Sequence, residues 1–241
     1  MLGLLVIIIV SWVLLRFIQR TNLDALGIVP NGKRAKQFLI GFLVMIFISL
    51  STIGIESLVL KIDWKLNSSI NYKEIFNAVI YHFKSALTED LVFRGAILYI
   101  LIQRIGAKKA MLLSALCFGI YHVFSYGITE GGIILITYVI VITGFVGYVW
   151  AYTFHKTRSI LMALGIHIAT NLINTFFFES NPYGELIFTK VSGIDLSGWN
   201  NLYFLIFKGL FPTILTLIFV KLYLRYSTKS KELGTSDKKT V

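Results

Sequence analysis

The sequence predicts an all-α fold, a polytopic bundle of transmembrane helices with about seven spans and a range of six to eight. Hydrophobic residues make up 56% of the 241 residues and charged residues only 15%, so polar side chains are too few to coat the outward helix faces of a soluble domain. Several apolar runs approach or exceed the roughly 20 residues that cross a bilayer as a helix. The Lys and Arg residues gather in short clusters between these runs, as membrane orientation signals do.

Seven spans account for the apolar runs, and the third is the least regular. It is too long for one crossing and carries several charged side chains, so we expect a broken helix or a pair of helices there. Residues 1–226 then form one integral-membrane domain with a motif-bearing core at about 80–178, and residues 227–241 form a disordered polar cytoplasmic tail. The predicted spans are residues 2–18, 37–60, 74–103, 108–126, 132–154, 159–178 and 200–222.

The basic clusters predict the orientation of the chain. Under the positive-inside rule, the side with most Lys and Arg is the cytoplasm, which puts the N-terminus outside and the C-terminus inside. The first run lacks a basic leader and is expected to stay as a span. The bilayer is therefore an expected partner, nucleic acid is not, and the small size fits a multi-pass protein of a bacterial cell membrane. The cytoplasmic clusters are Arg16/Arg20, Lys33/Arg34/Lys36, Arg104/Lys108/Lys109, Lys156/Arg158 and the tail from Lys221.

Ionisable residues inside an apolar span are the strongest functional signal. Each costs on the order of several kcal/mol at membrane depth, so it faces the bundle interior or a water-filled cavity. Asp90 and Arg94 are four residues apart and are predicted to form an ion pair on one helix face. Glu89 points away from that pair toward a neighbouring helix, without a partner in its own helix.

Two later spans also present polar side chains toward a partner helix. Phe118 and His122 are four residues apart on one face, and His167, Asn171 and Asn174 form one stripe. A single histidine in a membrane helix is usually an interhelical hydrogen-bonding residue. Two imidazoles together with a carboxylate can hold or deprotonate a water molecule, and an amide can donate to an oxyanion.

Three short motifs follow one another on these helices. They are Glu89-Asp90-Leu-Val-Phe-Arg94-Gly95, Phe118 to His122, and His167 to Asn171. In order and spacing they resemble the CPBP family, the CAAX-protease and bacteriocin-processing (Abi) membrane proteins, which include the type II CAAX prenyl endopeptidases. The family usually has a second Glu where this chain has Asp90, a change that keeps the charge and shortens the side chain by one methylene.

The resemblance implies that the protein is an intramembrane endopeptidase. Glu89 would accept a proton from a water held by His122, and His167 with Asn171 would stabilise the oxyanion. The expected substrate is a peptide or protein, whether prenylated, bacteriocin-like or a signalling peptide. The predicted boundaries place Glu89 and His122 beyond mid-membrane from the cytoplasm, and His167 nearer to it.

Asp90 and Arg94 would act indirectly, by fixing the helix that aims Glu89. No cofactor is firmly implied. A single zinc held by Glu89, His122 and His167 is an alternative, because one carboxylate and two imidazoles with an open position also match a hydrolytic zinc site.

A function from another class stays open. A non-proteolytic membrane scaffold or a bacteriocin self-immunity protein of the same fold would carry the same motifs. The change to Asp90 favours this alternative, while retention of Glu89, His122, His167 and Asn171 favours chemistry.

Other residues have simpler interpretations. His82 shares the helix face of Glu89 but is expected to be a polar anchor near the outer boundary, and Cys117 a small core residue. Trp150 and Trp199 are expected to be interface anchors at span ends. Residues 179–199 are expected to form a loop.

Overall fold

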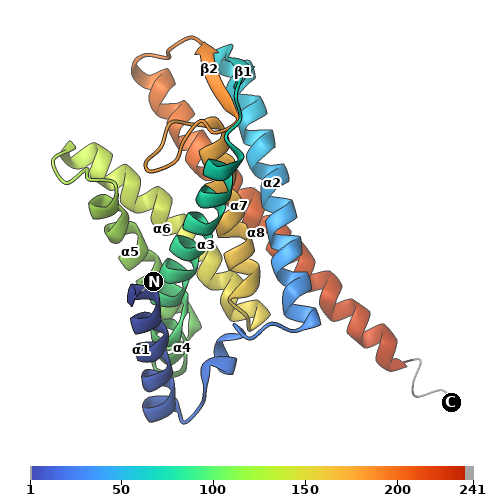
Figure 1. Cartoon of the computed structure of the whole chain (residues 1–241). Helices are drawn as coiled ribbons and strands as arrows, with labels where there is room; N and C mark the ends of the chain where they lie inside the picture. The colour runs from blue at the N-terminus through green and yellow to red at the C-terminus, as the bar shows by residue number, and fades with distance from the viewer. Residues whose placement is uncertain (1, 237–241) are drawn as a thin grey trace.

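The computed structural model describes residues 2–236, with side chains to residue 227, and these residues form an almost entirely helical bundle (Figure 1). The predicted all-α polytopic fold is confirmed. The helices are α1 (Leu2–Gln19), α2 (Gly32–Leu60), α3 (Tyr72–Arg94), α4 (Ala96–Ile105), α5 (Ala107–Ser125), α6 (Gly132–Thr157), α7 (Leu161–Phe177) and α8 (Gly198–Ser236). A short 3-10 helix (Leu23–Leu26) precedes α2, and two strands, β1 (Asp63–Leu66) and β2 (Phe188–Ser192), pair with each other.

The distribution of side chains is that of a membrane protein. Large apolar side chains face outward, for example Phe47 at 74% and Leu58 at 82% exposure, whereas the ion pair of Asp90 and Arg94 is fully buried. A soluble protein rarely exposes so much contiguous apolar surface. Five helices, α1, α2, α5, α6 and α8, are long and apolar enough to cross a bilayer, and α7 is a shorter apolar helix.

The predicted third span, residues 74–103, is two helices. α3 begins where the Asn71 side chain accepts hydrogen bonds from the backbone N–H groups of Lys73 and Glu74 at 3.2 and 3.3 Å, a standard N-terminal cap. It ends at Gly95, after which α4 has only ten residues. At 1.5 Å per residue α4 is about 15 Å long, too short to cross the membrane. The segment therefore consists of one long helix, α3, followed by a short one.

Helices α2 and α7 approach each other through two glycines. A Cβ atom at Gly165 would lie 2.3 Å from the carbonyl oxygen of Phe38, and one at Gly41 would lie 2.5 Å from that of Met162. Only residues without a side chain fit such a crossing, and small residues play this role at many membrane helix interfaces. The crossing fixes α7 two residues before His167.

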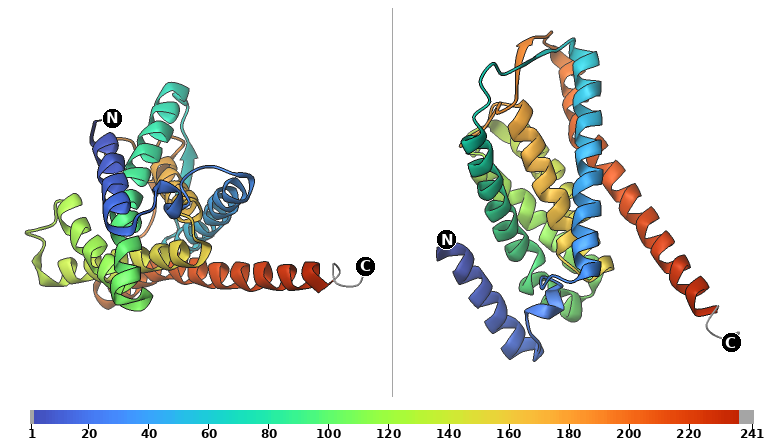
Figure 2. Two further views of the ribbon diagram at one scale, coloured as in Figure 1. Left: turned by 90° about the horizontal axis from the view of Figure 1, so that it is seen from below. Right: turned by 45° about the vertical axis from the view of Figure 1, so that its right-hand side comes forward.

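The bundle has two ends of different character. At one end lie β1, β2 and the ends of α2, α5 and α7, and we call it the strand end (Figure 1). At the other end α1, α4 and α6 finish and α2, α5 and α7 begin, and we call it the basic end. α1 and α4 pack against α3, while α8 packs on α2 and α6 and then diverges from the bundle toward the C-terminus (Figure 2).

The segment 179–199, predicted as a loop, contains strand β2, which pairs antiparallel with β1. Trp64 of β1 attaches this strand pair to the bundle. Its indole N–H donates to the Ser57 hydroxyl at 2.7 Å, and its ring meets those of Phe177 and Phe178 edge-on at 5.3 and 5.7 Å. A strand pair between loops so far apart in sequence leaves no local signal, because its pairing is set by tertiary contacts.

The predicted disordered tail also differs from the structure in part. α8 continues to Ser236, so residues 227–236 are helical, and residues 237–241 lie outside the described residues. The sequence of this part contains Lys, Glu and Leu, which are good helix formers. Extending an existing helix carries no nucleation cost.

A second ion pair, which is partly buried and was not singled out from the sequence, links α2 to α8. The Lys208 ammonium donates to the Glu56 carboxylate at 2.6 Å, and the two side chains are 36% and 8% exposed. The ammonium also lies 4.5 Å above the ring of Phe178. Both residues lie in runs so apolar that hydropathy assigns them simply to spans.

We predict that Lys208→Met destabilises the protein more than the double change Glu56→Gln with Lys208→Met. The single change leaves Glu56 charged and unpaired, which costs roughly 3–5 kcal/mol for a fully buried pair and less here because Lys208 is one-third exposed. The double change removes both charges. Thermal unfolding of the two variants in detergent checks the order, and a double variant as unstable as the single one contradicts it.

Candidate functional site

Residues from three helices line one cavity of about 240 Å3, which we call the polar chamber. α3 contributes Glu89, α5 contributes His122, and α7 contributes His167 and Asn171. The structure thus brings together the four residues that the sequence predicts to act on substrate, although the predicted boundaries placed His167 at another depth. The chamber is lined by Tyr81, His82, Ser85, Glu89, His122, Ser125, Tyr126, His167, Asn171, Asn174, Thr175, Ser180 and Asn181.

His167 lies between two carboxylates of α3. Its Nδ1 is 3.4 Å from Oδ1 of Asp90, and its Nε2 is 3.8 Å from Oε2 of Glu89. An Nδ1–H that donates to Asp90 leaves Nε2 turned toward Glu89. The second separation is too long for a direct hydrogen bond. Glu89, whose side chain is 18% exposed and whose Oε1 accepts from the Ser85 hydroxyl at 3.3 Å, therefore stays accessible from the chamber.

The predicted ion pair between Asp90 and Arg94 is present, and both side chains are fully buried. The guanidinium carbon of Arg94 lies 4.4 Å from the ring centroid of Phe118 and 5.0 Å from that of Trp150. Cation–π contacts of this kind stabilise a desolvated cation. Arg94 thereby holds Asp90, and Asp90 in turn contacts His167.

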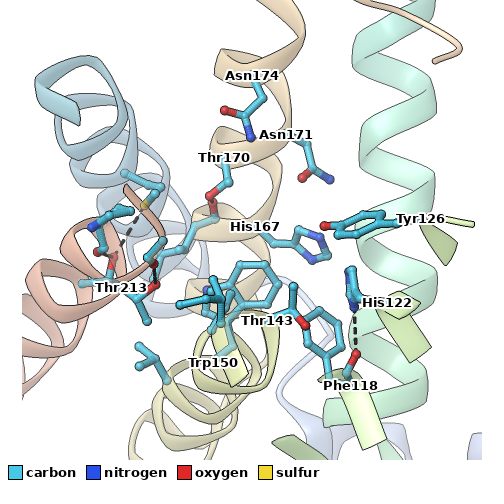
Figure 3. A pocket seen from close by; sticks show the side chains of 18 residues that line it. Phe118, His122, Tyr126, Thr143, Trp150, His167, Thr170, Asn171, Asn174 and Thr213 are labelled. Carbon is cyan, nitrogen blue, oxygen red and sulfur yellow. Dashed lines mark hydrogen bonds between the residues drawn. The ribbon is translucent and has the colours of Figure 1, made fainter. Parts of the chain in front are cut away.

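His122 is oriented by its own helix. Its Nδ1 lies 2.8 Å from the carbonyl oxygen of Phe118, as the dashed line in Figure 3 shows. A carbonyl oxygen only accepts, so Nδ1 carries the hydrogen, and in the neutral ring Nε2 is left with a lone pair. The rings of Phe118 and His122, predicted to share one helix face, are in contact with centroids 4.3 Å apart and planes tilted by 57°. Nε2 of His122 is thus free to accept a hydrogen bond from water.

A second cavity of about 260 Å3 adjoins the chamber, and we call it the apolar cavity (Figure 3). It lies among α2, α5, α6, α7 and α8 and has side chains such as Met45, Ile142 and Val146 in its wall. Five residues line both cavities: His122, Tyr126, His167, Asn171 and Asn174. The two imidazoles therefore stand where a polar space meets an apolar one.

Tyr126 is a site residue that was missed in the sequence. It follows His122 by four residues, the spacing that would have indicated it, and Figure 3 shows its hydroxyl pointing toward His167. Its ring lies 5.0 Å from that of His122. Tyr126 is therefore placed to donate a hydrogen bond into the space between the cavities.

Three interpretations from the sequence are corrected. His82 is not a boundary anchor: it is 9% exposed, lines the chamber, and its Nε2 lies 2.7 Å from the Thr175 hydroxyl in a hydrogen bond. Trp150 is not an interface anchor but is 5% exposed and packs against the His167 ring with centroids 4.2 Å apart. Cys117 is exposed rather than in the core. Each error arises because sequence position gives a depth but not the direction of a neighbour.

The zinc alternative gains no support from this arrangement. In the described part of the chain, no three His, Cys, Asp or Glu side chains gather closely enough to hold a metal ion. The Nδ1 atoms of His167 and His122 face Asp90 and a backbone carbonyl, so each ring keeps Nε2 as its available nitrogen, as a zinc-binding histidine would. Glu89, His122 and His167 are nevertheless not close enough together to act as three ligands of one ion, and the mechanism proposed below uses no metal.

Gly95, the last residue of the first motif, has a steric role. It joins α3 to α4, and a Cβ atom there would lie 2.0 Å from the carbonyl oxygen of Leu91. That oxygen belongs to the backbone of α3 and cannot move aside as a flexible side chain could, so only glycine allows the turn directly after Arg94. The break in the helix and the position of the buried ion pair depend on the same residue.

The fold and the site together define a polytopic membrane protein with a carboxylate and two imidazoles buried among its helices. Residues 71–173 match the family model described as "Type II CAAX prenyl endopeptidase Rce1-like". The resemblance drawn from the three motifs is thereby confirmed over these residues, which make up less than half of the chain.

A curated relative matches over most of the chain. "Uncharacterized protein YyaK" of Bacillus subtilis (strain 168) is 27% identical over 248 residues, which cover 91% of this chain and 72% of that protein. No solved structure matches.

We predict that Gly95→Ala lowers stability by roughly 2–3 kcal/mol, the upper range for overpacking against a structure that cannot yield. The matched control is Gly54→Ala in α2, where a Cβ atom meets nothing within 4 Å. That change should be neutral or stabilise by up to about 1 kcal/mol. Thermal unfolding in detergent measures both, and equal effects of the two changes would contradict the steric role.

Proposed function

We propose that the protein is an intramembrane endopeptidase that hydrolyses a peptide bond with a water molecule activated by Glu89. The observation that carries the proposal is the convergence of Glu89, His122 and His167 from three helices on one chamber. The family match supports protease chemistry at the coarser level of the family.

The residues offer a route for the reaction. A water donates one hydrogen bond to Nε2 of His122, and Glu89 accepts its other proton as the oxygen attacks the scissile carbonyl carbon. The tetrahedral oxyanion accepts hydrogen bonds from the Asn171 amide and from Nε2 of His167 in its imidazolium form. When the C–N bond breaks, Glu89 returns the proton to the leaving amine, so protons balance and no serine or cysteine nucleophile is needed.

Asp90 and Arg94 position this machinery. Asp90 is shorter by one methylene than the usual family residue, yet it contacts both Arg94 and Nδ1 of His167. The shorter side chain is therefore long enough to make both contacts in this chain. The contact between Asp90 and His167 favours the enzymatic hypothesis. The scaffold or immunity hypothesis has no structural observation of its own.

The two cavities fit a substrate with a polar backbone and an apolar portion. The scissile carbonyl would lie at the residues shared by the cavities, with the apolar portion in the apolar cavity. Prenylated, bacteriocin-like and signalling peptides all meet this requirement. The geometry therefore indicates a peptide with an apolar portion but does not select one of these three kinds. Location in a bacterial cell membrane remains part of the proposal, based on composition and on the multi-pass fold.

We predict that Glu89→Gln lowers kcat about 10^2–10^4-fold, the usual contribution of a general base, with little change in stability. The matched control is Glu74→Gln, the same substitution at an exposed position in the first turn of the same helix, which should retain activity. Purified protein in proteoliposomes, with a panel of prenylated and unprenylated fluorogenic peptides, provides the assay.

Two results would contradict the proposal. Cleavage that persists in Glu89→Gln removes the proposed base. Cleavage that vanishes with a strong chelator and returns with added zinc replaces the metal-free mechanism. If cells expressing Glu89→Gln keep an immunity phenotype while cleavage is lost, the scaffold role is a separate activity of the same fold.

A further inference from the structure

The polar chamber extends from the site toward one end of the bundle. On α3 its lining residues run from Glu89 back to Tyr81, and on α7 they run from His167 forward to Thr175. Ser180 and Asn181, in the exposed segment after α7, complete it. From Glu89 and His167, these residues extend toward the strand end, so the chamber opens at the strand end.

On the opposite side the site is closed by packed side chains. Asp90 and Arg94 are 0% exposed, Leu91 is 1%, Phe118 is 2% and Trp150 is 5%. A small cavity of about 20 Å3 near the basic end shares no lining residue with the chamber. Water therefore reaches Glu89 from the strand end.

The charges identify which side of the membrane each end faces. The ends of α1, α4 and α6 and the starts of α2 and α5 carry the basic clusters, among them Arg16, Lys33, Arg104, Lys108 and Lys156. Cytoplasmic loops carry the excess of Lys and Arg in membrane proteins. The basic end is then cytoplasmic, and the strand end, with the mouth of the chamber, is extracytoplasmic.

Glu89 lies well inside the chamber. Tyr81 and Glu89 both line it and are eight residues apart on α3, which corresponds to about 12 Å along a helix. A bond cleaved at Glu89 thus lies deeper in the bundle than the residues near the mouth of the chamber.

We infer that the site takes its water and its substrate from the extracytoplasmic side of the membrane. The substrate is a peptide, or a segment of a membrane-anchored protein, that is exposed on that side and inserts an apolar portion into the apolar cavity. A peptide confined to the cytoplasm has no route to Glu89. The statement about substrate rests on the proposed endopeptidase function, whereas the opening of the chamber does not.

Thiol labelling in intact cells tests the opening. In a Cys117→Ala background, which removes the native exposed thiol, Ser85→Cys places a thiol inside the chamber and Asn181→Cys places one at its mouth. A charged, membrane-impermeant thiol reagent should label both at least tenfold faster than Lys108→Cys at the basic end. After permeabilisation, Lys108→Cys should react as well.

A matched control separates the chamber from the lipid-facing surface. Phe83 is two residues from Ser85 on the same helix and is 46% exposed on its outer surface. Phe83→Cys should react slowly with the charged reagent because a thiol in lipid is neither ionised nor reachable. External labelling of Lys108→Cys, with Ser85→Cys protected until permeabilisation, would overturn the inference.

A cleavage experiment with membrane vesicles distinguishes failure of the inference from failure of the proposed function. A membrane-impermeant peptide that the purified protein cleaves should be cleaved at least tenfold faster by right-side-out vesicles than by inverted ones. The reverse ratio overturns the inference. If the purified protein cleaves no peptide, the endopeptidase function fails, and the labelling result alone decides where the chamber opens.

Discussion

The buried carboxylate of Asp90 is the constraint on which the site depends. A charge inside a membrane bundle must have partners, and Asp90 has one in its own helix, Arg94, and one in α7, His167. Arg94 in turn lies against the rings of Phe118 and Trp150. This chain of contacts ties α3 to α5, α6 and α7 at one level of the bundle. Glu89, one residue before Asp90, is thereby brought to face His167.

The sequence was sufficient to predict the helices, the Asp90–Arg94 pair and the four residues that converge on the chamber. Helical periodicity and the cost of buried charge depend on local spacing, which a sequence displays directly. The parts that escaped prediction depend on which helix lies opposite. His82 meets Thr175 across 93 positions, and Glu56 meets Lys208 across 152. Neither spacing nor hydropathy records such partners, and the same holds for the pairing of β1 with β2.

The site is organised as a boundary between two environments. The polar chamber supplies water and hydrogen-bonding groups, while the apolar cavity supplies a surface for an apolar portion of a ligand. His122, His167 and Asn171 stand between them, where a peptide bond has to lie if its two sides differ in polarity. The closed packing below the site then makes hydrolysis inside a membrane compatible with an intact permeability barrier, because the aqueous route ends at Glu89.

A double-mutant cycle between Asp90 and His167 tests the central contact most directly. Asp90→Asn, His167→Gln and the combined variant would be compared by kcat/KM on one cleaved peptide, with stability monitored in parallel. If Asp90 acts through His167, the second change costs little once the first is made, and the coupling energy exceeds about 1 kcal/mol. Losses that simply add, within about 0.5 kcal/mol, would contradict the account.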